Sequence, residues 1–348
     1  MNTSTSNKIH ITILLLIVVV FILVGLDLFL GSVKIPFKSI CSILIGETAE
    51  KESWKIIIFQ SRLPKAIAAI LCGSALSVCG LQMQTLFRNP LAGPYILGIS
   101  SGAGLGVAIF IMGLSFLGIS ASAITLSANS GIIIASILGS FGVLAILLSV
   151  ISRLKDIMTV LILGIMIGSV ITAIIGIIQY FSHDAQLKSF IMWTMGNLSS
   201  VTNDQLTLLG PIVVTGLILS FIASKSLNAY LLGEAYAKSL GVNIKQSRIL
   251  IIIITSILTG SITAYCGPIG FIGIVIPHLA RMISNSSDHR VLTPLSILLG
   301  INVLLIADII SQLPGLDQNL PINSITSLIG IPFIIWIILK NKKIANLN

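Results

Sequence analysis

Few side chains of this sequence could do chemistry, and their spacing keeps them apart. The four histidines are dispersed along the chain, and its four cysteines form no CxxC pair. The sequence also lacks the HExxH, GxSxG and GxxxxGK[ST] patterns, which excludes the enzyme classes and the phosphate-binding loop that those motifs mark. Buried free thiols are the expected state of the cysteines. We therefore predict no catalytic residue, no metal site and no directly bound cofactor.

The composition predicts the fold class. Of 348 residues, 55% are hydrophobic and 9% are charged, and the mean hydropathy is +1.08. Soluble domains carry roughly 25% charged residues. The apolar runs are continuous, whereas the strands of a membrane β-barrel alternate apolar and polar residues. We expect an all-α polytopic membrane protein. The net charge of +9 is scattered over loops and predicts membrane topology rather than nucleic-acid binding.

Ten apolar runs have the length or the composition of membrane helices. A span needs about 20 apolar residues. The first run lacks a signal-peptide cleavage site and is expected to stay as a helix. A polar surface loop follows at 31–61, and a second polar insert occupies 225–247. The predicted helices cover about 11–30, 62–86, 91–113, 130–151, 157–181, 205–224, 248–266, 269–283, 293–312 and 322–340.

The lysines and arginines predict the orientation of the chain. Ten spans place both termini on one side of the membrane. If that side is the cytosol, 13 lysines and arginines lie inside and 7 lie outside. This bias favours cytosolic termini. Six of the seven outer cations fall within 34–65, so that outer basic segment needs an explanation of its own.

A weak internal repeat suggests how the helices are organised. At an offset of 187 residues, five positions of 73–90 are identical to positions of 260–277, although chance remains an alternative. The two copies start on opposite sides of the membrane, which is the inverted repeat of many transporters. We expect one transmembrane domain over 1–348, with repeat one at about 62–181 and repeat two at about 248–340.

Small residues recur every four positions in two of the predicted helices. Ordinary helix packing is the more common use of such stripes, and lining a pathway is the alternative. The two stripes comprise Gly98, Gly102, Gly106, Gly164, Gly168, Thr172 and Gly176.

The insert at 226–248 has the pattern of a short cytosolic helix–turn–helix. Asn228 can cap a short helix and Gly241 can end it, and the next helix begins near Asn243. The segment could be a mere loop. It is also what docking into the groove of a soluble partner requires.

Several long motifs resemble one family. They are RLPK at 62–65, GSALSVCGLQMQTLFRNPLAGPYILGISSGA at 73–103, WTMGNL at 193–198, LGEAYAKSLGVNIKQSR at 232–248, GPIGFIGIVIPHLARMI at 267–283 and LIGIPFIIWIILK at 328–340. In this order they resemble the permease subunits of the iron-siderophore/cobalamin (FecCD-type) ABC importers. The resemblance implies a type II importer permease with about ten helices in the bacterial cytoplasmic (inner) membrane.

The resemblance also implies partners. A second permease copy would form a homodimer or a close heterodimer with a pathway at the subunit interface. Two separate ATPase subunits would hydrolyse ATP, so this chain would not itself be an enzyme. Coupling helices at about 227–247 would contact them through Leu231, Leu232, Gly233, Glu234, Ala237, Leu240 and Gly241. The turn motifs at the cytosolic face would comprise Arg88, Asn89, Pro90, Pro277, His278 and Arg281.

At the outer face, the resemblance implies a periplasmic or lipid-anchored substrate-binding protein. Arg62 and Lys65 match cations that receive its acidic residues, and such rim charges steer docking. Membrane-flanking snorkelling is the alternative explanation of these cations. Gln312 stands where the family usually has a docking arginine, and Asn319 stands where it usually has an acidic residue.

These features lead to ranked hypotheses. The first is the permease of an ATP-driven importer for a large metal chelate, an iron(III)–siderophore complex, with cobalamin or haem as alternatives within the family. The second is a secondary transporter driven by an ion gradient, which would also suit an inverted repeat. Intramembrane carboxylates and histidines for coupling ions are scarce, which speaks against it. A membrane enzyme is a distant third.

Overall fold

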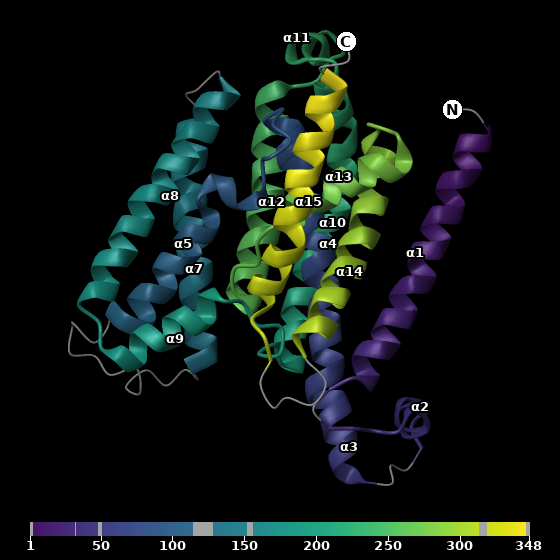
Figure 1. The fold of residues 1–348 in the computed structure, drawn as a ribbon. Coiled ribbons are helices and arrows are strands. Elements are labelled where there is room, and N and C mark those ends of the chain that lie inside the picture. The colour runs from purple at the N-terminus through teal and green to yellow at the C-terminus, as the bar shows by residue number, and fades with distance from the viewer. Residues whose placement is uncertain are drawn as a thin grey trace.

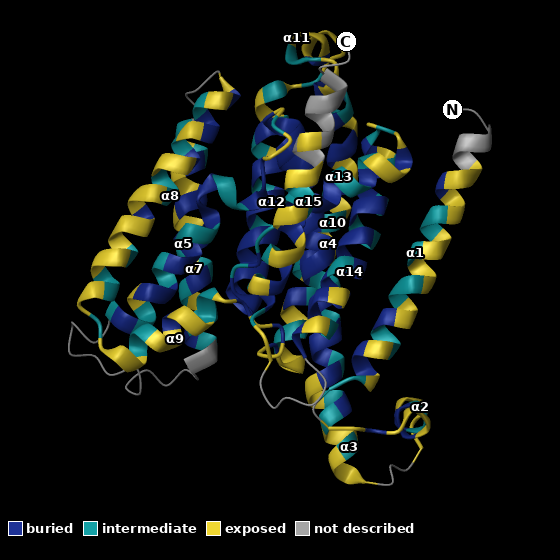
Figure 2. Cartoon of the chain, viewed as in Figure 1, coloured by how far each residue is buried: buried dark blue, intermediate teal, exposed yellow. Residues whose placement is uncertain are grey.

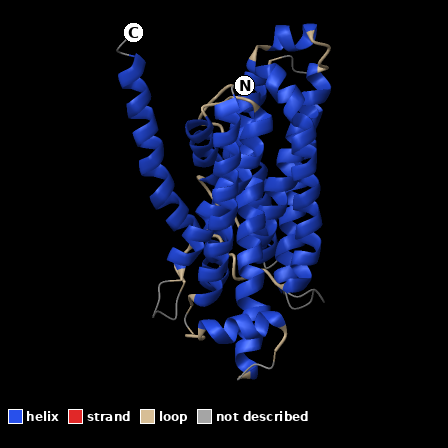
Figure 3. Ribbon diagram, turned by 90° about the vertical axis from the view of Figure 1, so that its right-hand side faces the viewer, coloured by secondary structure: helices blue, strands red, loops and turns tan. Residues whose placement is uncertain are grey.

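The structure is a computed structural model that describes residues 3–31, 33–47, 51–113, 128–151, 156–312 and 319–345. Every regular element in these ranges is a helix (Figures 1 and 3). The elements are α1 Thr3–Phe29, α2 Phe37–Ile45, α3 Glu52–Ile57, η1 Ile58–Arg62, α4 Leu63–Leu86, η2 Pro94–Leu97, α5 Ile99–Ala108, η3 Ile109–Gly113, α7 Ala128–Ile151, α8 Ile157–Tyr180, α9 Asp184–Thr194, α10 Asn203–Leu231, α11 Glu234–Ser239, α12 Ile244–Cys266, α13 Ile272–Ser284, α14 His289–Ser311 and α15 Ile322–Ala345.

The prediction of about ten membrane helices is confirmed. Among the described residues, seven helices are long and apolar enough to span a bilayer, and three shorter apolar helices accompany them. The shorter ones are α5 with η3, α13, and the apolar part of α15. The predicted helix at 91–113 starts at Ile99 instead, because Pro90 and Pro94 interrupt regular hydrogen bonding before it.

Helix α4 is the centre of the bundle, and 20 of its 24 residues are buried. It packs against α10, α12, α13 and α14, and Figure 2 shows its dark-blue core. Glycines permit the closest approaches. A Cβ on Gly73 would collide with the backbone of Gly300, and one on Gly80 with the backbone of Gly273. Close backbone contact through small residues is the usual way in which membrane helices associate.

The remaining helices form two groups around this centre. Helices α5, α7, α8 and α9 lie together on the left of Figure 1, and α7 joins them to α12. Helix α1 lies at the opposite edge and contacts mainly α14. Only 6% of its apolar span is buried inside the protein, as expected for a helix that faces lipid.

The two halves of the chain repeat each other in inverted orientation. Helix α4 starts at the end of the molecule that carries α3, whereas α12 starts at the end that carries α11 (Figure 1). Each is followed by a short helix, α5 or α13. The residue before each short helix has positive φ, +73° at Gly98 and +67° at Phe271.

The alignment at an offset of 187 residues is wrong in register. It pairs Pro90, which lies in the turn after α4, with Pro277, which lies inside α13. The elements match instead at Gly98 with Phe271, and both breaks open with a Gly-Pro pair, at Gly93 and at Gly267.

The two ends of the molecule carry different structures. Helices α2 and α3 project from one end, and α11 lies at the other (Figure 1). Arg62 and Lys65, at the start of α4, therefore lie opposite Glu234 of α11, as the predicted topology requires. The start of α1 and the end of α15 lie at the same end as α11 (Figures 1 and 3).

Candidate functional site

A buried charge cluster closes the α3 end of the bundle. The Lys65 ammonium lies 2.9 Å from a carboxylate oxygen of Asp308 and 3.8 Å from one of Asp27. The Gln312 amide donates a hydrogen bond of 2.5 Å to Asp27. All four side chains are buried, so the lysine is paired where an unpaired charge would be strongly unfavourable. The cluster joins α1, α4 and α14.

Arg62 completes the attachment of α1. Its guanidinium donates to the carbonyl oxygens of Leu28 at 2.6 Å, Phe29 at 3.1 Å and Val33. Carbonyl groups at the C-terminal end of a helix lack partners within the helix, and a cation there also matches the helix dipole. The arginine therefore caps α1 rather than facing solvent.

The structure corrects the composition predicted for the docking surface. Arg62 and Lys65 are each 5% exposed, and the contacts described above occupy their charged groups. They present no free cation to a partner in this conformation. The sequence did not show that these cations are buried, because the carboxylates Asp27 and Asp308 lie on helices that are distant in the sequence and come close only in the folded chain. Exposed cations at this end include four lysines of the segment that carries α2 and α3, Lys34, Lys38, Lys51 and Lys55.

Gln312 takes part in this cluster as a neutral donor at the position where the family usually has an arginine. Its amide and the Lys65 ammonium contact the same oxygen of Asp27, and the other Asp27 oxygen has no hydrogen-bond partner.

The two Gly-Pro breaks meet in the middle of the molecule. The Tyr95 hydroxyl donates to the carbonyl of Ile269 at 2.5 Å and accepts from the Ile269 amide at 2.9 Å. The side chain of Asn323 accepts from the Gly270 amide at 2.9 Å. These bonds satisfy backbone groups of irregular segments inside an apolar bundle, which is the condition for such segments to exist there.

Most of the predicted glycine stripes serve helix packing. Gly102 packs against Gly139 of α7, and Gly106 packs against Ala135 so closely that a Cβ would overlap the backbone. Gly98 lies against Gly164 and Gly168 of α8. No atom lies within 4 Å of where a Cβ of Gly176 would be, and the Thr172 hydroxyl donates to its own helix.

The same small residues also border an open recess. It has a volume of about 410 Å³ and lies where η2 and α5 meet α8. Its lining residues are Tyr95, Ile96, Gly98, Ser101, Gly164, Ile165, Gly168, Ser169 and Thr172. A role in packing and a role in lining a pathway are thus compatible on this face of α8.

The turn after α4 is fixed by neighbouring helices. Arg88, in a left-handed conformation at φ +47°, donates to the carbonyl of Tyr230. The imidazole of His278 lies 2.9 Å from the carbonyl of Pro90. In the turn itself, the Asn89 side chain accepts from the Leu91 amide.

Helix α13 is tied to α4 by a second contact at this end. Arg281 donates to the Gln84 side chain at 2.6 Å, and Gln84 donates in turn to the carbonyl of Ile274. Pro277 is buried inside α13. The turn residues singled out in the sequence thus contribute to one network, to which Gln84 and Tyr230 also belong.

Asn228 does not cap the short cytosolic helix as predicted. It lies inside α10, where its amide donates to Asp288 at 2.6 Å and its oxygen accepts from the His289 amide. Burial raises the pKa of Asp288, but hydrogen bonds from the Arg290 amide and Asn228 outweigh it, so the pKa lies below its usual range. Gly233 precedes α11 instead, at φ +108°.

Helix α11 presents an apolar surface at this end. Leu231, Leu232 and Leu240 are exposed, and Leu232 is 65% exposed. Tyr236, which the sequence analysis missed, is also exposed. Together we call these four side chains the α11 surface.

The other predicted coupling residues shape that surface from below. Glu234 accepts a 2.5 Å contact from Arg248 of α12, and Ala237 is fully buried. Gly241, at φ +82°, provides the left-handed turn that ends α11. Gly233 also has a positive φ and directly precedes α11. Neither glycine has a side chain that could contact a partner.

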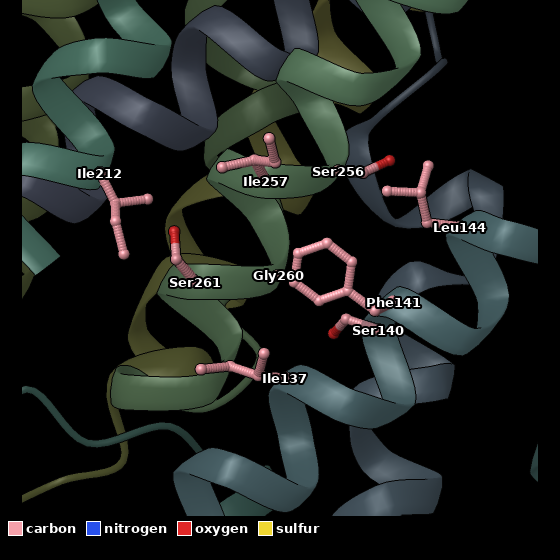
Figure 4. A pocket seen from close by; sticks show the side chains of 9 residues that line it. All are labelled: Ile137, Ser140, Phe141, Leu144, Ile212, Ser256, Ile257, Gly260 and Ser261. Carbon is pink, nitrogen blue, oxygen red and sulfur yellow. The ribbon is translucent and has the colours of Figure 1, made fainter.

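Two further cavities lie between helices. One, of about 270 Å³, is bordered by 192–200, 265–267 and 319–321 near the lower end of α12. The other, of about 240 Å³, lies at the seam of α7, α10 and α12, and its walls are apolar apart from three serines (Figure 4). Among the described residues, no group of three or more His, Cys, Asp or Glu side chains could hold a metal ion.

Comparison with known proteins gives consistent matches. The profile of the FecCD transport family matches residues 15–340. The hemin transport system permease HmuU of Yersinia pestis is 33% identical, with 99% of each chain covered. The vitamin B12 import system permease BtuC of Klebsiella pneumoniae is 35% identical, over 83% of this chain and 84% of its own.

A solved structure agrees in fold. It is described as an inward-facing conformation of a metal-chelate type ABC transporter. It has a TM-score of 0.81 and 28% identity, and the match covers 94% of this chain and 99% of the other.

Proposed function

This chain belongs to the FecCD transport family and is an ABC importer permease, and from that premise we propose that it carries an iron(III)–siderophore complex across the bacterial cytoplasmic membrane. The observation that supports this most is the separation of two specialised ends. The α11 surface lies opposite the charge cluster and the lysine-rich α2–α3 segment. An importer driven by a cytosolic motor and loaded from outside needs both.

The α11 surface is the proposed contact with the ATPase subunits. Tyr236 on α11 and the exposed leucines that flank this short helix are suited to a hydrophobic groove of a soluble partner. The Arg248 contact holds Glu234, so movement of α11 would pass to α12. ATP is used by those partners, and both termini of the permease share their cytosolic side.

A second copy of the chain is the proposed neighbour of α8. Its small residues border the open recess, and Val170 on this helix is 60% exposed. Two such recesses facing each other would form a pathway wide enough for a bulky chelate. The binding protein would deliver that cargo at the α2–α3 end, where the exposed Lys51 and Lys55 can steer an acidic partner.

Alternating access would require the two groups of helices to move relative to each other. The α4-centred group is closely packed through glycines, so it would move as one body. A ligand shifts the equilibrium between the inward-open and outward-open conformations only if it binds one of them more tightly than the other. ATP, bound by the ATPase subunits, and the loaded binding protein would each bind the two conformations with different affinity, at opposite ends of the permease.

Transport in proteoliposomes tests the proposed cargo. The permease, its ATPase and its binding protein are reconstituted, and uptake of ferric siderophore, hemin and cobalamin is compared. We expect ATP-dependent uptake of the ferric siderophore. Uptake of hemin or cobalamin alone would identify one of the family alternatives. The names of the relatives HmuU and BtuC point to these two cargoes. Uptake that follows an ion gradient without ATP would contradict the coupling mechanism.

A further inference from the structure

Helix α2 has an exposed apolar face that water would not favour. Its inner face packs Ile40 and Ile43 into a small core with Leu28 and Ile58. On its outer side, Ile45 is 78% exposed, and the same side carries exposed Phe37 and Leu44. Residues seven and eight positions apart share one helix face, so these three side chains form one surface. An exposed apolar face on a short helix that also carries a lysine fits a membrane interface.

This surface continues onto the lipid-facing side of α1. The rings of Phe29 and Phe37 contact each other edge to face, with their centroids 6.5 Å apart. Beside them lies a groove of about 440 Å³, whose lining residues are Phe21, Ile22, Gly25, Leu26, Phe29 and Phe37. Gly25 keeps the groove open, because no atom lies within 4 Å of where its Cβ would be.

Positive charge lies close in the sequence to Phe37, which lines this groove. Lys34 and Lys38 are exposed and flank Phe37 in the sequence, and Lys38 belongs to the first turn of α2. The first backbone amides of that helix have no side-chain cap, which adds partial positive charge there. Phosphate groups of anionic lipids attract lysines at a membrane surface.

We propose that α2 and the outer end of α1 bind an anionic phospholipid of the surrounding membrane. One acyl chain lies in the groove over Gly25, and the phosphate lies at Lys34 and Lys38. The charge complementarity and the continuity with the lipid-facing surface of α1 favour a lipid over a protein segment. The site would hold α2 at the interface. The proposal requires that α1 spans the membrane. It does not depend on which cargo the permease carries.

Native mass spectrometry of the full-length chain tests this proposal. The chain is reconstituted in vesicles of phosphatidylcholine and phosphatidylglycerol, extracted gently, and the retained lipids are counted. We expect retention of phosphatidylglycerol to exceed that of phosphatidylcholine several-fold. The K34E/K38E double variant should retain phosphatidylglycerol and phosphatidylcholine in equal amounts. Gly25→Leu, whose Cβ would meet no atom of another helix within 4 Å, should fold and should lower the retention of both.

Lys188→Glu provides the matched control. Lys188 is an exposed lysine of α9, away from the groove, so its variant should keep the preference for phosphatidylglycerol. Equal retention of both lipids by the wild type, or an unchanged preference in K34E/K38E, would overturn the proposal. Weaker binding-protein affinity of K34E/K38E with unchanged lipid retention would assign the lysines to protein docking instead.

Discussion

At the scale of single residues, Lys65 shows how a charge is accommodated inside a membrane protein. Its ammonium lies between Asp27 and Asp308, and Gln312 completes the set with a neutral donor. A buried ion pair contributes little compared with an apolar replacement, but removal of one partner leaves an uncompensated charge. The cluster is therefore sensitive to single substitutions, and Lys65 is its most sensitive member.

Lys65→Met should destabilise the protein by about 3–5 kcal/mol, because it leaves two buried carboxylates without their cation. Thermal unfolding in detergent, followed by loss of the monodisperse species, measures the effect. Lys55→Met, at an exposed position, should have almost no effect. Combining Lys65→Met with Asp308→Asn should cost less than the sum of the two single changes, and strict additivity would contradict the pairing.

The carboxylate of Asp288 predicts a pH dependence. Because its pKa is lowered in the folded state, its contribution to stability is fully present above the unfolded pKa of about 4. The contribution is lost as the pH falls through the lowered folded pKa. The stability of the wild type should therefore exceed that of Asp288→Asn at neutral pH, and the difference should shrink below about pH 4. A constant difference down to pH 2 would contradict this.

At the scale of the elements, glycines determine how closely the helices approach α4. Gly73 and Gly300 face each other across the α4–α14 contact, with room for no side chain. Gly80 and Gly273 do the same between α4 and α13. The glycines in this core thus control interaxial distance, whereas Gly142 of α7 meets no neighbouring atom within 4 Å.

Gly73→Val should force α4 and α14 apart and destabilise the fold by at least about 1–3 kcal/mol. Gly142→Val is the control at an open helical position, and it should retain the wild-type unfolding temperature within a few degrees. The measurement is thermal unfolding of both variants in the same detergent. Equal unfolding temperatures of the two variants would show that the close α4–α14 contact does not determine the stability of the fold.

A substitution on the α11 surface should weaken coupling to the ATPase without affecting the folding of the permease. Leu232→Asp changes an exposed side chain, so the permease should fold normally. Its binding to the ATPase subunits should weaken by at least about tenfold, which corresponds to about 1.4 kcal/mol. Gln246→Asp introduces the same charge at an exposed position of the neighbouring α12 and should leave binding intact. Co-purification with the ATPase measures both, and equal losses would argue against a specific α11 contact.

At the scale of the whole molecule, the proposed dimer predicts a contact between copies through α8. Val170→Cys should form an intermolecular disulfide under mild oxidation, because its side chain is exposed on α8. Leu15→Cys, exposed on α1 at the opposite edge, should not. Non-reducing electrophoresis measures both variants against the wild type. Crosslinking of Leu15→Cys in preference to Val170→Cys would place the interface on the other side.

The sequence by itself determined the membrane class and the number of helices. Apolar length and the scarcity of charge decide these properties, and both are local along the chain. The turn at Gly241 and the helix start at Asn243 could likewise be located, because short-range backbone conformation requires those residue types.

Only the tertiary structure decided the partners of Arg62 and Lys65. The cations looked like rim charges because Asp27 and Asp308 are far away in the sequence, and nothing local shows that they converge. The register of the repeat failed for a related reason, because identities among common residues carry less information than matching backbone breaks at Gly98 and Phe271. Pairing across helices depends on three-dimensional distance, and a linear pattern does not contain that distance.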